Sequence, residues 1–124
     1  MAHAEIDIDT ERRLITIVVQ GELTDTDLLQ GYERLRERPD FSSDFDELVD
    51  LLGADGRQIT ADGVRTLARR PPSYSPHARR AVVVPSEMGY GMARMYELMQ
   101  DGESGQIRVF RSREDAEHWL LNPD

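Results

Sequence analysis

The chain has 124 residues, enough for one compact domain but too few for two domains of ordinary size, so we expect a single domain over residues 1–124. Its 24 acidic and 15 basic side chains give a net charge of −9, which disfavours a nucleic-acid partner because such a chain repels phosphates. The absence of cysteine excludes disulfides, thiolate catalysis and cysteine-ligated metals, and it favours a cytoplasmic location. No secretory signal pattern opens the chain and no apolar run reaches membrane-spanning length, so we expect no membrane insertion.

The first third of the sequence predicts a β-hairpin followed by a helix. Ile6 and Ile8 alternate with acidic residues, as in an edge strand, whereas residues 14–19 form a continuous run rich in β-branched side chains, as in a central strand. Thr24 is a good N-cap for a helix whose apolar residues recur at helical spacing. A proline should end that helix near Arg38.

The middle of the sequence predicts a strand, a helix and another strand. Residues 48–52 are mostly apolar, as in a strand covered on both faces, and the Gly-Ala-Asp-Gly sequence at residues 53–56 should break this strand. Thr60 is a suitable cap for a second helix, which should end in an extended, proline-rich loop at residues 71–76. Residues 81–84 predict a fourth strand.

The last third predicts a helix, a strand and a final helix. Ser86 caps a longer helix, which Gly102 and Gly105 should end. Residues 107–110 predict the fifth strand, and Ser112 opens the last helix in a capping-box-like pattern. The side chains that this helix should bury are Ala116, Trp119 and Leu120.

The predicted order of elements is therefore ββαβαβαβα. After the opening hairpin each strand is followed by a helix, a pattern that requires crossover connections between parallel strands. The fold class is α/β, with a mostly parallel sheet, an N-terminal antiparallel edge hairpin and helices packed on the sheet.

Residues with catalytic or metal-binding chemistry are scattered through the sequence. His3, His77 and His118 lie far apart and no pair has metal-ligand spacing, so we predict no metal site. Ser73 and Ser75 lie near His77 in the proline-rich loop, where turn formation explains them better than a catalytic triad. The chain also lacks a phosphate-binding loop. We therefore expect no catalytic residues and no cofactor, and predict that the protein is not an enzyme.

Four of the five methionines lie in one predicted helix, along a single stripe. Such a stripe either faces the sheet or overlaps an apolar ligand groove or a dimer contact, because methionine suits adaptable surfaces. The candidate residues for a ligand or homodimer face are Tyr74, Met88, Met92, Met95 and Tyr96.

Residues 18–24, Val-Val-Gln-Gly-Glu-Leu-Thr, resemble the opening of STAS domains (sulfate transporter and anti-sigma-factor antagonist), in which a core strand runs into Gly-Glu-Leu-Asp and then a helix. Thr24 stands where the aspartate is common. With the strand at residues 48–52, the turn at residues 60–63 and the order of elements, the resemblance spans nearly the whole chain. More closely, the chain resembles the stand-alone SpoIIAA-like group, also described as STAS/SEC14-like.

In regulatory STAS proteins, a partner kinase phosphorylates a hydroxyl residue just before the glycine at the start of the second helix, in a pattern similar to Asp-Ser-Ser-Gly. The resemblance places Gly63 at that glycine and Asp62 at the phosphorylatable serine, so no hydroxyl remains there. The carboxylate of Asp62 either stabilises the helix start through the helix dipole or gives a docking surface a fixed negative charge. By this resemblance, the partner-binding candidates are Gly21, Glu22, Leu23, Thr24, Thr60, Asp62 and Gly63.

Three functions follow from these patterns. The first is a non-enzymatic interaction module that binds a protein partner, as the resemblance implies. The second is a small protein that binds an apolar ligand or lipid, like the related SEC14 domains, in a cleft beside the methionine-rich helix. The third is an enzyme of unrecognised type, which would have to draw on residues near strand ends or in loops: Asp50, Asp55, Asp62, Tyr74 and His77.

Overall fold

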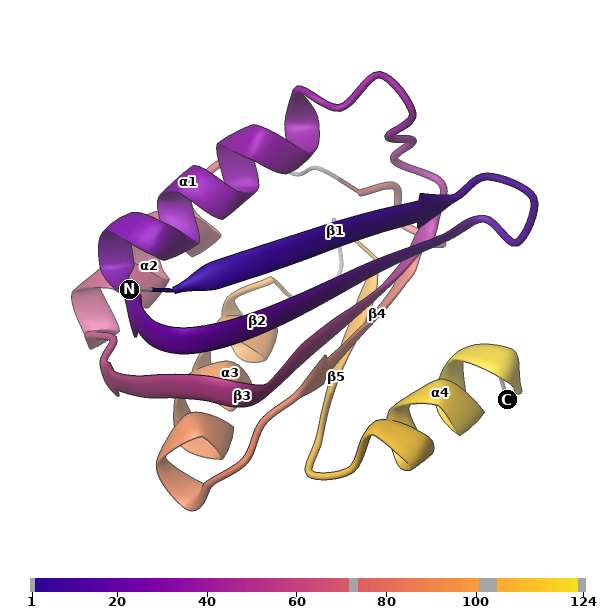
Figure 1. Cartoon of the computed structure of the whole chain (residues 1–124). Helices are drawn as coiled ribbons and strands as arrows, with labels where there is room; N and C mark the ends of the chain where they lie inside the picture. Colours follow the sequence, from indigo (N-terminus) through magenta and orange to yellow (C-terminus); the bar gives the residue numbers. More distant parts are fainter. Residues whose placement is uncertain (1, 72–73, 101–104, 123–124) are drawn as a thin grey trace.

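The computed structural model describes residues 2–71, 74–100 and 105–122, and it describes only the backbone of Glu87 and Met88. The order of elements is ββαβαβαβα, as predicted (Figure 1). The strands are β1 (His3–Asp9), β2 (Leu14–Thr24), β3 (Asp46–Gln58), β4 (Arg79–Val83) and β5 (Gln106–Phe110). The helices are α1 (Asp25–Arg36), α2 (Ala61–Ala68), α3 (Glu87–Met99) and α4 (Arg113–Leu121).

The five strands form one sheet in the order β1-β2-β3-β4-β5. β1 pairs antiparallel with β2, and each later strand pairs parallel with the one before it. The α/β class and the mostly parallel sheet with an antiparallel edge hairpin are therefore confirmed.

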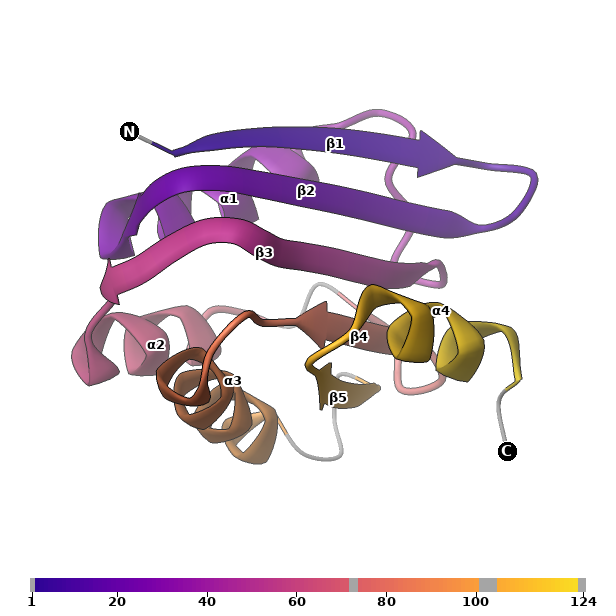
Figure 2. The same cartoon turned by 60° about the horizontal axis from the view of Figure 1, so that its bottom comes forward.

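Helices α1, α2 and α3 cover one face of the sheet, and α4 covers the other (Figure 2). The strand order explains this division. Three crossovers that advance in the same direction along a sheet, each right-handed, put their helices on the same face. α4 follows the last strand and is free of that constraint, so it packs against β3, β4 and β5 from the opposite side.

Each helix begins at the residue that the sequence indicates. The side chains of Thr24, Thr60, Ser86 and Ser112 accept hydrogen bonds from backbone amides in the first turns of α1 to α4. In α1 the capping box is complete, because Asp27 in turn accepts from the Thr24 backbone amide at 2.9 Å. These local bonds fix the helix starts.

The prediction that β3 breaks at residues 53–56 is wrong. β3 continues to Gln58 and stays paired with β2, with Gly53 opposite Gln20 and Asp55 opposite Glu22. The register shifts between Val18 and Gln20, so the glycine marks an irregularity in the ladder rather than a turn. β4 pairs with β3 only as far as Asp50, so residues 20–24 of β2 and 53–58 of β3 extend beyond it as a segment here called the β2–β3 ribbon, which β1 joins only at Gln20.

α3 ends at Met99 with Gln100 as its C-cap, before the two glycines predicted to end it, and Gly102 lies outside the described residues. Gly105 is described, with a φ of 87° that favours glycine. A Cβ at this position would lie 2.2 Å from the carbonyl oxygen of Ala78. The glycine therefore allows the chain to enter β5 close to the segment that precedes β4.

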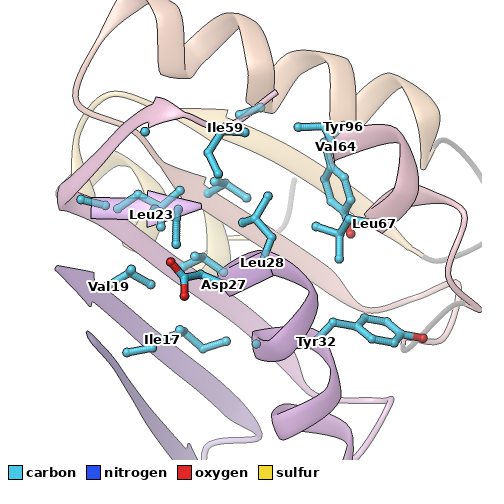
Figure 3. A pocket seen from close by; sticks show the side chains of 18 of the residues that line it. Ile17, Val19, Leu23, Asp27, Leu28, Tyr32, Ile59, Val64, Leu67 and Tyr96 are labelled. Carbon is cyan, nitrogen blue, oxygen red and sulfur yellow. The ribbon is translucent and has the colours of Figure 1, made fainter. Parts of the chain in front are cut away.

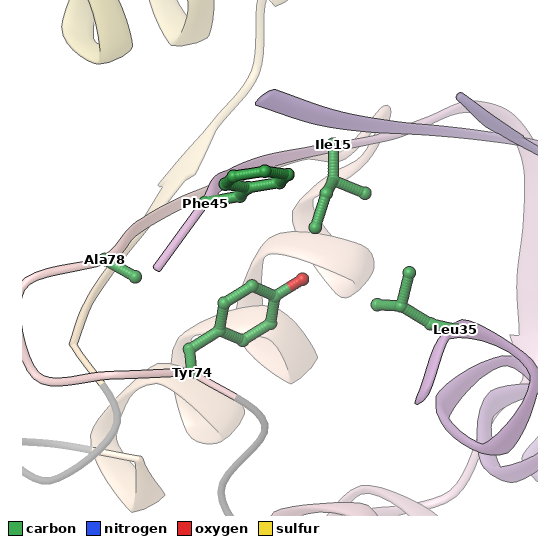
Figure 4. Packing of buried hydrophobic residues seen from close by; sticks show 5 residues of the cluster. All are labelled: Ile15, Leu35, Phe45, Tyr74 and Ala78. Carbon is green, nitrogen blue, oxygen red and sulfur yellow. The ribbon is translucent and has the colours of Figure 1, made fainter. Parts of the chain in front are cut away.

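Two clusters of buried side chains form the core, one on each face of the sheet. The first lies beside α1 and the segment before β4 and consists of Ile15, Leu35, Phe45, Tyr74 and Ala78 (Figure 4). The second lies under α4 and consists of Leu48, Ala81, Val83, Ala116 and Trp119. Ala116 and Trp119 are buried as predicted, and Leu120 is partly buried against the second cluster.

Within the described part of the chain, no helix is both long enough and apolar enough to cross a membrane.

Candidate functional site

The two segments that resemble STAS motifs meet at one corner of the fold, where Asp25 joins them. The carboxylate of Asp25, the first residue of α1, accepts from the backbone amide of Thr60 at 2.9 Å and from its hydroxyl at 2.6 Å. The Thr60 hydroxyl oxygen also accepts from the amide of Gly63 at 3.0 Å. One carboxylate thus holds the starts of α1 and α2 together.

Gly63 is required by this arrangement because the Asp25 carboxylate lies directly against it. A Cβ at Gly63 would lie 2.2 Å from Cγ of Asp25, closer than real side chains approach each other. The Asp25–Thr60–Gly63 corner, named after these residues, was only half predicted. Sequence reasoning placed Thr60 and Gly63 but missed Asp25, whose position after a helix cap gives no sign of a partner 35 residues away.

The other residues of the predicted partner-binding set differ in accessibility. Asp62 is exposed, with 93% of its side chain accessible, and forms an ion pair with Arg65 at 2.7 Å. Gly21 and Glu22 are also exposed. Leu23 is buried and lines a cavity. The surface at this corner therefore consists of the β2 end and the Asp62 carboxylate.

A cavity of about 830 Å³ lies between the sheet and helices α1, α2 and α3 (Figure 3). Its wall is mainly apolar. The sheet contributes Ile17, Val19, Leu23, Val49 and Val82, and the helices and the loop before α2 contribute Leu28, Ile59, Val64, Leu67 and Met92. The β2–β3 ribbon contributes Leu23, Ala54 and Arg57 to the lining of the cavity.

The accessibility of the central strands is consistent with this cavity. Leu48 and Val83, which face α4, are almost completely buried. Val49 and Val82, their neighbours on the opposite face, are only partly buried although α1, α2 and α3 cover that face. A well-packed core would enclose such positions as completely as those under α4. The central apolar side chains on this face therefore border open space.

Polar groups gather at one place in the cavity wall, around Arg80. The guanidinium of Arg80 donates to the Tyr96 hydroxyl at 3.4 Å and to Oε1 of Gln100 at 3.3 Å. It also lies 4.9 Å from the centre of the Tyr74 ring. The Tyr74 hydroxyl donates to Oε2 of Glu47, which stands opposite Arg80 in the β3–β4 register. We call these five residues the Arg80 cluster.

Burial changes the acidity of three members of the Arg80 cluster. It raises the pKa of the Glu47 carboxyl, an effect that the nearby Arg80 charge opposes but does not cancel. It also raises the pKa of the Tyr74 and Tyr96 hydroxyls, so both remain protonated and able to donate hydrogen bonds. The cluster therefore combines a permanent cation, two neutral donors and a carboxyl whose pKa burial raises.

The structure divides the predicted ligand or dimer face. Tyr74, Met92 and Tyr96 line the cavity, whereas the half-buried Met95 is not among the lining residues. Met88 lies outside the described side chains. Sequence reasoning missed the contributions of Gly31, Leu67 and Arg80, because nothing in a hydrophobic pattern distinguishes a wall from a filled core.

The residues considered for catalysis do not form a shared cluster. Asp50 pairs with Arg113, Asp55 with Arg57 and Asp62 with Arg65. Tyr74 bonds to Glu47 instead, and His77 lies 3.1 Å from Asp44. The five candidates thus have five different polar partners.

The contacts of His77 also differ from those of a catalytic triad. Ser75 Oγ lies 3.2 Å from Nε2 of His77, and Asp44 approaches the same nitrogen. A triad needs the nucleophile and the acid on opposite ring nitrogens. Ser73 lies outside the described residues. Among the residues that the structure covers, no group of three or more histidine and acidic side chains is placed to hold a metal ion.

Comparison with known proteins yields a match in structure but not in sequence. No family model matches the chain, and no curated protein matches it. A similar solved structure is that of an uncharacterised protein of the DUF3478 family from Shewanella loihica PV-4, described as having a SpoIIAA-like fold. The two share 18% sequence identity with a TM-score of 0.61, and the match covers 96% of this chain and 93% of that one. The strand and helix order, the caps at Thr24 and Thr60 and this structural match together establish that the chain has a SpoIIAA-like fold.

Proposed function

We propose that this protein binds a small apolar molecule in the cavity between the sheet and helices α1, α2 and α3. The observation that carries the proposal is the partial burial of Val49 and Val82, on the central strands and beneath three helices. Both apolar side chains line the cavity. An apolar ligand would complete the packing that the protein's own side chains leave open.

The size and lining of the cavity support this function. Sites for small molecules typically measure about 300–1,000 Å³ and have apolar walls with a few polar groups that orient the ligand. This cavity of about 830 Å³ falls within that range and has one such group, the Arg80 cluster. Water forms few hydrogen bonds with an apolar wall, so its replacement by an apolar molecule lowers the free energy.

Two glycines allow a matched test of the cavity. Gly31 in the middle of α1 lines it, and Gly91 in α3 is exposed and does not. A Cβ at either position would meet no atom within 4 Å, so neither position obstructs the start of a side chain. We expect Gly31→Leu to weaken binding of the neutral apolar dye N-phenyl-1-naphthylamine by roughly tenfold or more, because leucine occupies ligand volume. The measurement is a fluorescence titration of the purified protein.

Gly91→Leu is the control and should bind the dye as the wild type does. Both variants also gain helix propensity, since glycine is about 1 kcal/mol less favourable than alanine or leucine within a helix. Lower stability therefore does not account for a loss of binding by Gly31→Leu alone. Wild-type protein that fails to bind the dye, or equal binding by both variants, would contradict the proposed function.

A second candidate function is the docking of a protein partner at the Asp25–Thr60–Gly63 corner. The specific observation that favours it is the bond pair between Asp25 and Thr60, which brings the exposed β2 end and the exposed Asp62 into one surface. A fixed carboxylate at this corner imitates part of the charge of a phosphorylated residue. Docking here is compatible with a ligand inside the cavity.

The docking candidate predicts that Asp62→Ala reduces partner capture several-fold in an affinity pull-down followed by mass spectrometry, because the surface charge is lost. Glu114→Ala, which removes an exposed carboxylate from the first turn of α4, is the control and should capture the same partner as the wild type. If Asp62→Ala and Glu114→Ala retain every partner equally, the corner is not a docking site.

A further inference from the structure

We propose that the face of the sheet on which α4 packs binds a second helix, supplied by a protein partner, over strands β1 and β2. This helix places an apolar stripe on β2 and lysine or arginine side chains beside β1. The proposal is independent of the apolar-ligand site, which lies on the opposite face of the sheet. Three observations support it: the uncovered part of this face, the apolar side chains of β2 and the acidic side chains of β1.

α4 covers only part of its face of the sheet. It packs against β3, β4 and β5. In the described part of the chain, no helix lies over β1 and β2 on this side (Figure 2). Neighbouring strands lie about 4.8 Å apart, so two strands together have roughly the 10 Å width of one helix. The uncovered area therefore has room for a single helix beside α4.

The register of the strands identifies the side chains on the uncovered area. Leu48 lies in the cluster under α4, and its neighbour on β2 is Thr16. Side chains two residues apart on a strand point to the same face, so Leu14 and Val18 point the same way as Thr16. The β1 residues opposite these three also share this face. We call the set the open sheet face: Glu5, Asp7, Asp9, Leu14, Thr16 and Val18.

β2 has the sequence of a strand that is covered on both faces. Residues 14–19 form a nearly continuous apolar run. Such runs are typical of strands between two layers, whereas a strand with one face in water alternates apolar and polar residues. Ile15 and Val19, which point toward α1, are buried, but Leu14 and Val18 on the open sheet face are only partly buried. β2 therefore carries apolar side chains for a layer that the described part of the chain does not supply.

The charge of the open sheet face indicates a basic partner. Its outer row, on β1, consists of three carboxylates. His3 lies 3.8 Å from the Glu5 carboxylate, but the two side chains are 74% and 79% exposed, so this pair is weak. On the inner side, Arg113 of α4 already pairs with Asp50 at 3.0 Å and with Glu117 at 3.6 Å. Lysine or arginine on the docked helix would complement the carboxylates of β1.

The shape of this face favours a helix of defined length over other occupants. An extended segment would pair with a strand edge, whereas the face of a sheet is covered by a helix or another sheet. β1 has seven residues, which span about 23 Å, and a helix of about 15 residues has the same length. A second copy of this chain is disfavoured, because its net charge of −9 would add to the negative charge already present.

The test uses a fluorescein-labelled peptide of about 15 residues that contains only leucine and lysine, with the leucines on one face of the helix. A second peptide has the same composition in an order that spreads the leucines around the helix. Fluorescence anisotropy with wild-type protein should show about tenfold tighter binding of the first peptide, because it alone combines an apolar stripe with a basic flank. Equal binding of the two peptides, or binding of neither, overturns the proposal.

Variants of the acidic row test the charge pairing. Glu5→Gln/Asp7→Asn should weaken binding of the first peptide by about threefold to tenfold, because two complementary charges are lost. The control is Glu33→Gln/Glu37→Gln, which makes the same change in charge at exposed residues of α1, on the opposite face of the sheet. It should bind the peptide as the wild type does. An equal loss in both double variants would show only general attraction to an acidic protein and would overturn the proposal.

A variant of the apolar floor tests the position of the helix. Val18→Lys should weaken binding by about tenfold or more, because it places a charge beneath the apolar stripe and repels the basic flank. Gln106→Lys adds the same charge at an exposed residue of β5, at the far edge of the sheet, and should have little effect. Undiminished binding by Val18→Lys overturns the proposal.

Urea unfolding identifies the variants that are folded. If Val18→Lys does not fold, Thr16→Lys replaces it at the neighbouring position of the open sheet face, with the same loss of binding expected. Folded variants of this face should still bind the apolar dye, because the cavity lies on the other side of the sheet. Failure of the helix-docking proposal is thus distinguishable from failure of the proposed function.

Discussion

Replacing Trp119 with alanine should lower the free energy of unfolding by about 3–5 kcal/mol, the usual cost of removing a buried tryptophan. The side chain is 7% exposed in the cluster under α4. The Arg79 guanidinium lies 4.1 Å from the centre of its ring, and the Phe110 ring lies 5.7 Å away. The alanine variant therefore loses apolar contacts and also a cation–π partner of a buried arginine.

Urea unfolding followed by circular dichroism measures this effect, and Leu121→Ala is the control within the same helix. Leu121 is 67% exposed, so its replacement should change the free energy of unfolding by no more than about 0.5 kcal/mol. A change below 1 kcal/mol for Trp119→Ala would mean that α4 contributes little to the core. Because α4 lies on the face opposite the cavity, folded Trp119→Ala should still bind the apolar dye.

Gly63→Ala should destabilise the protein by about 2–3 kcal/mol, although alanine normally favours a helix. The added methyl would overlap the Asp25 carboxylate, which two bonds to Thr60 hold in place. Movement of Asp25 would break those bonds and weaken the start of α2. The same substitution at Gly91, where a Cβ meets no atom within 4 Å, should stabilise by about 0.5–1 kcal/mol.

A double-mutant cycle separates the steric cause from other causes. Asp25→Ala removes the carboxylate that Gly63→Ala would strike, so the double variant should be more stable than the sum of the single effects predicts, by about 1 kcal/mol. The free energies come from the same urea titrations. Additive effects would show that the cost at Gly63 arises elsewhere, for instance in the backbone of α2.

Helix starts were predictable because their determinants are local. The side chains of Thr24, Thr60, Ser86 and Ser112 each accept from the amide three residues ahead in the sequence, within reach of a short pattern. Ile6 and Ile8 alternate with acidic residues, and this pattern likewise indicates which face of β1 is covered. From these elements the α/β class and its order follow.

The extent of β3 was not predictable from its own residues. A Gly-Ala-Asp-Gly sequence favours a turn in isolation, but here pairing with the lengthened β2 supplies hydrogen bonds that outweigh the local preference. The bond from Asp25 to Thr60 depends on that same extension, since it brings the starts of α1 and α2 together. Long-range pairing of this kind leaves no mark in a single sequence.

The cavity was anticipated only in part. The sequence indicated Tyr74, Met92 and Tyr96, because methionine and tyrosine are often found at adaptable surfaces. It did not indicate Arg80, since an arginine in an apolar strand looks the same whether it reaches a cavity or the solvent. Whether a core is filled depends on distances between elements, which hydrophobic patterns do not specify.

The β2–β3 ribbon is the part of the cavity wall that we expect to deform most easily. Within the ribbon, residues 53–58 of β3 are bonded to β2 on one side, and their other edge faces no strand because β4 pairs no further than Asp50. Local opening costs less free energy in a segment with fewer bonds than in the interior of the sheet. Under the proposed function, we therefore expect the ribbon to deform for ligands of different bulk while both core clusters keep their packing.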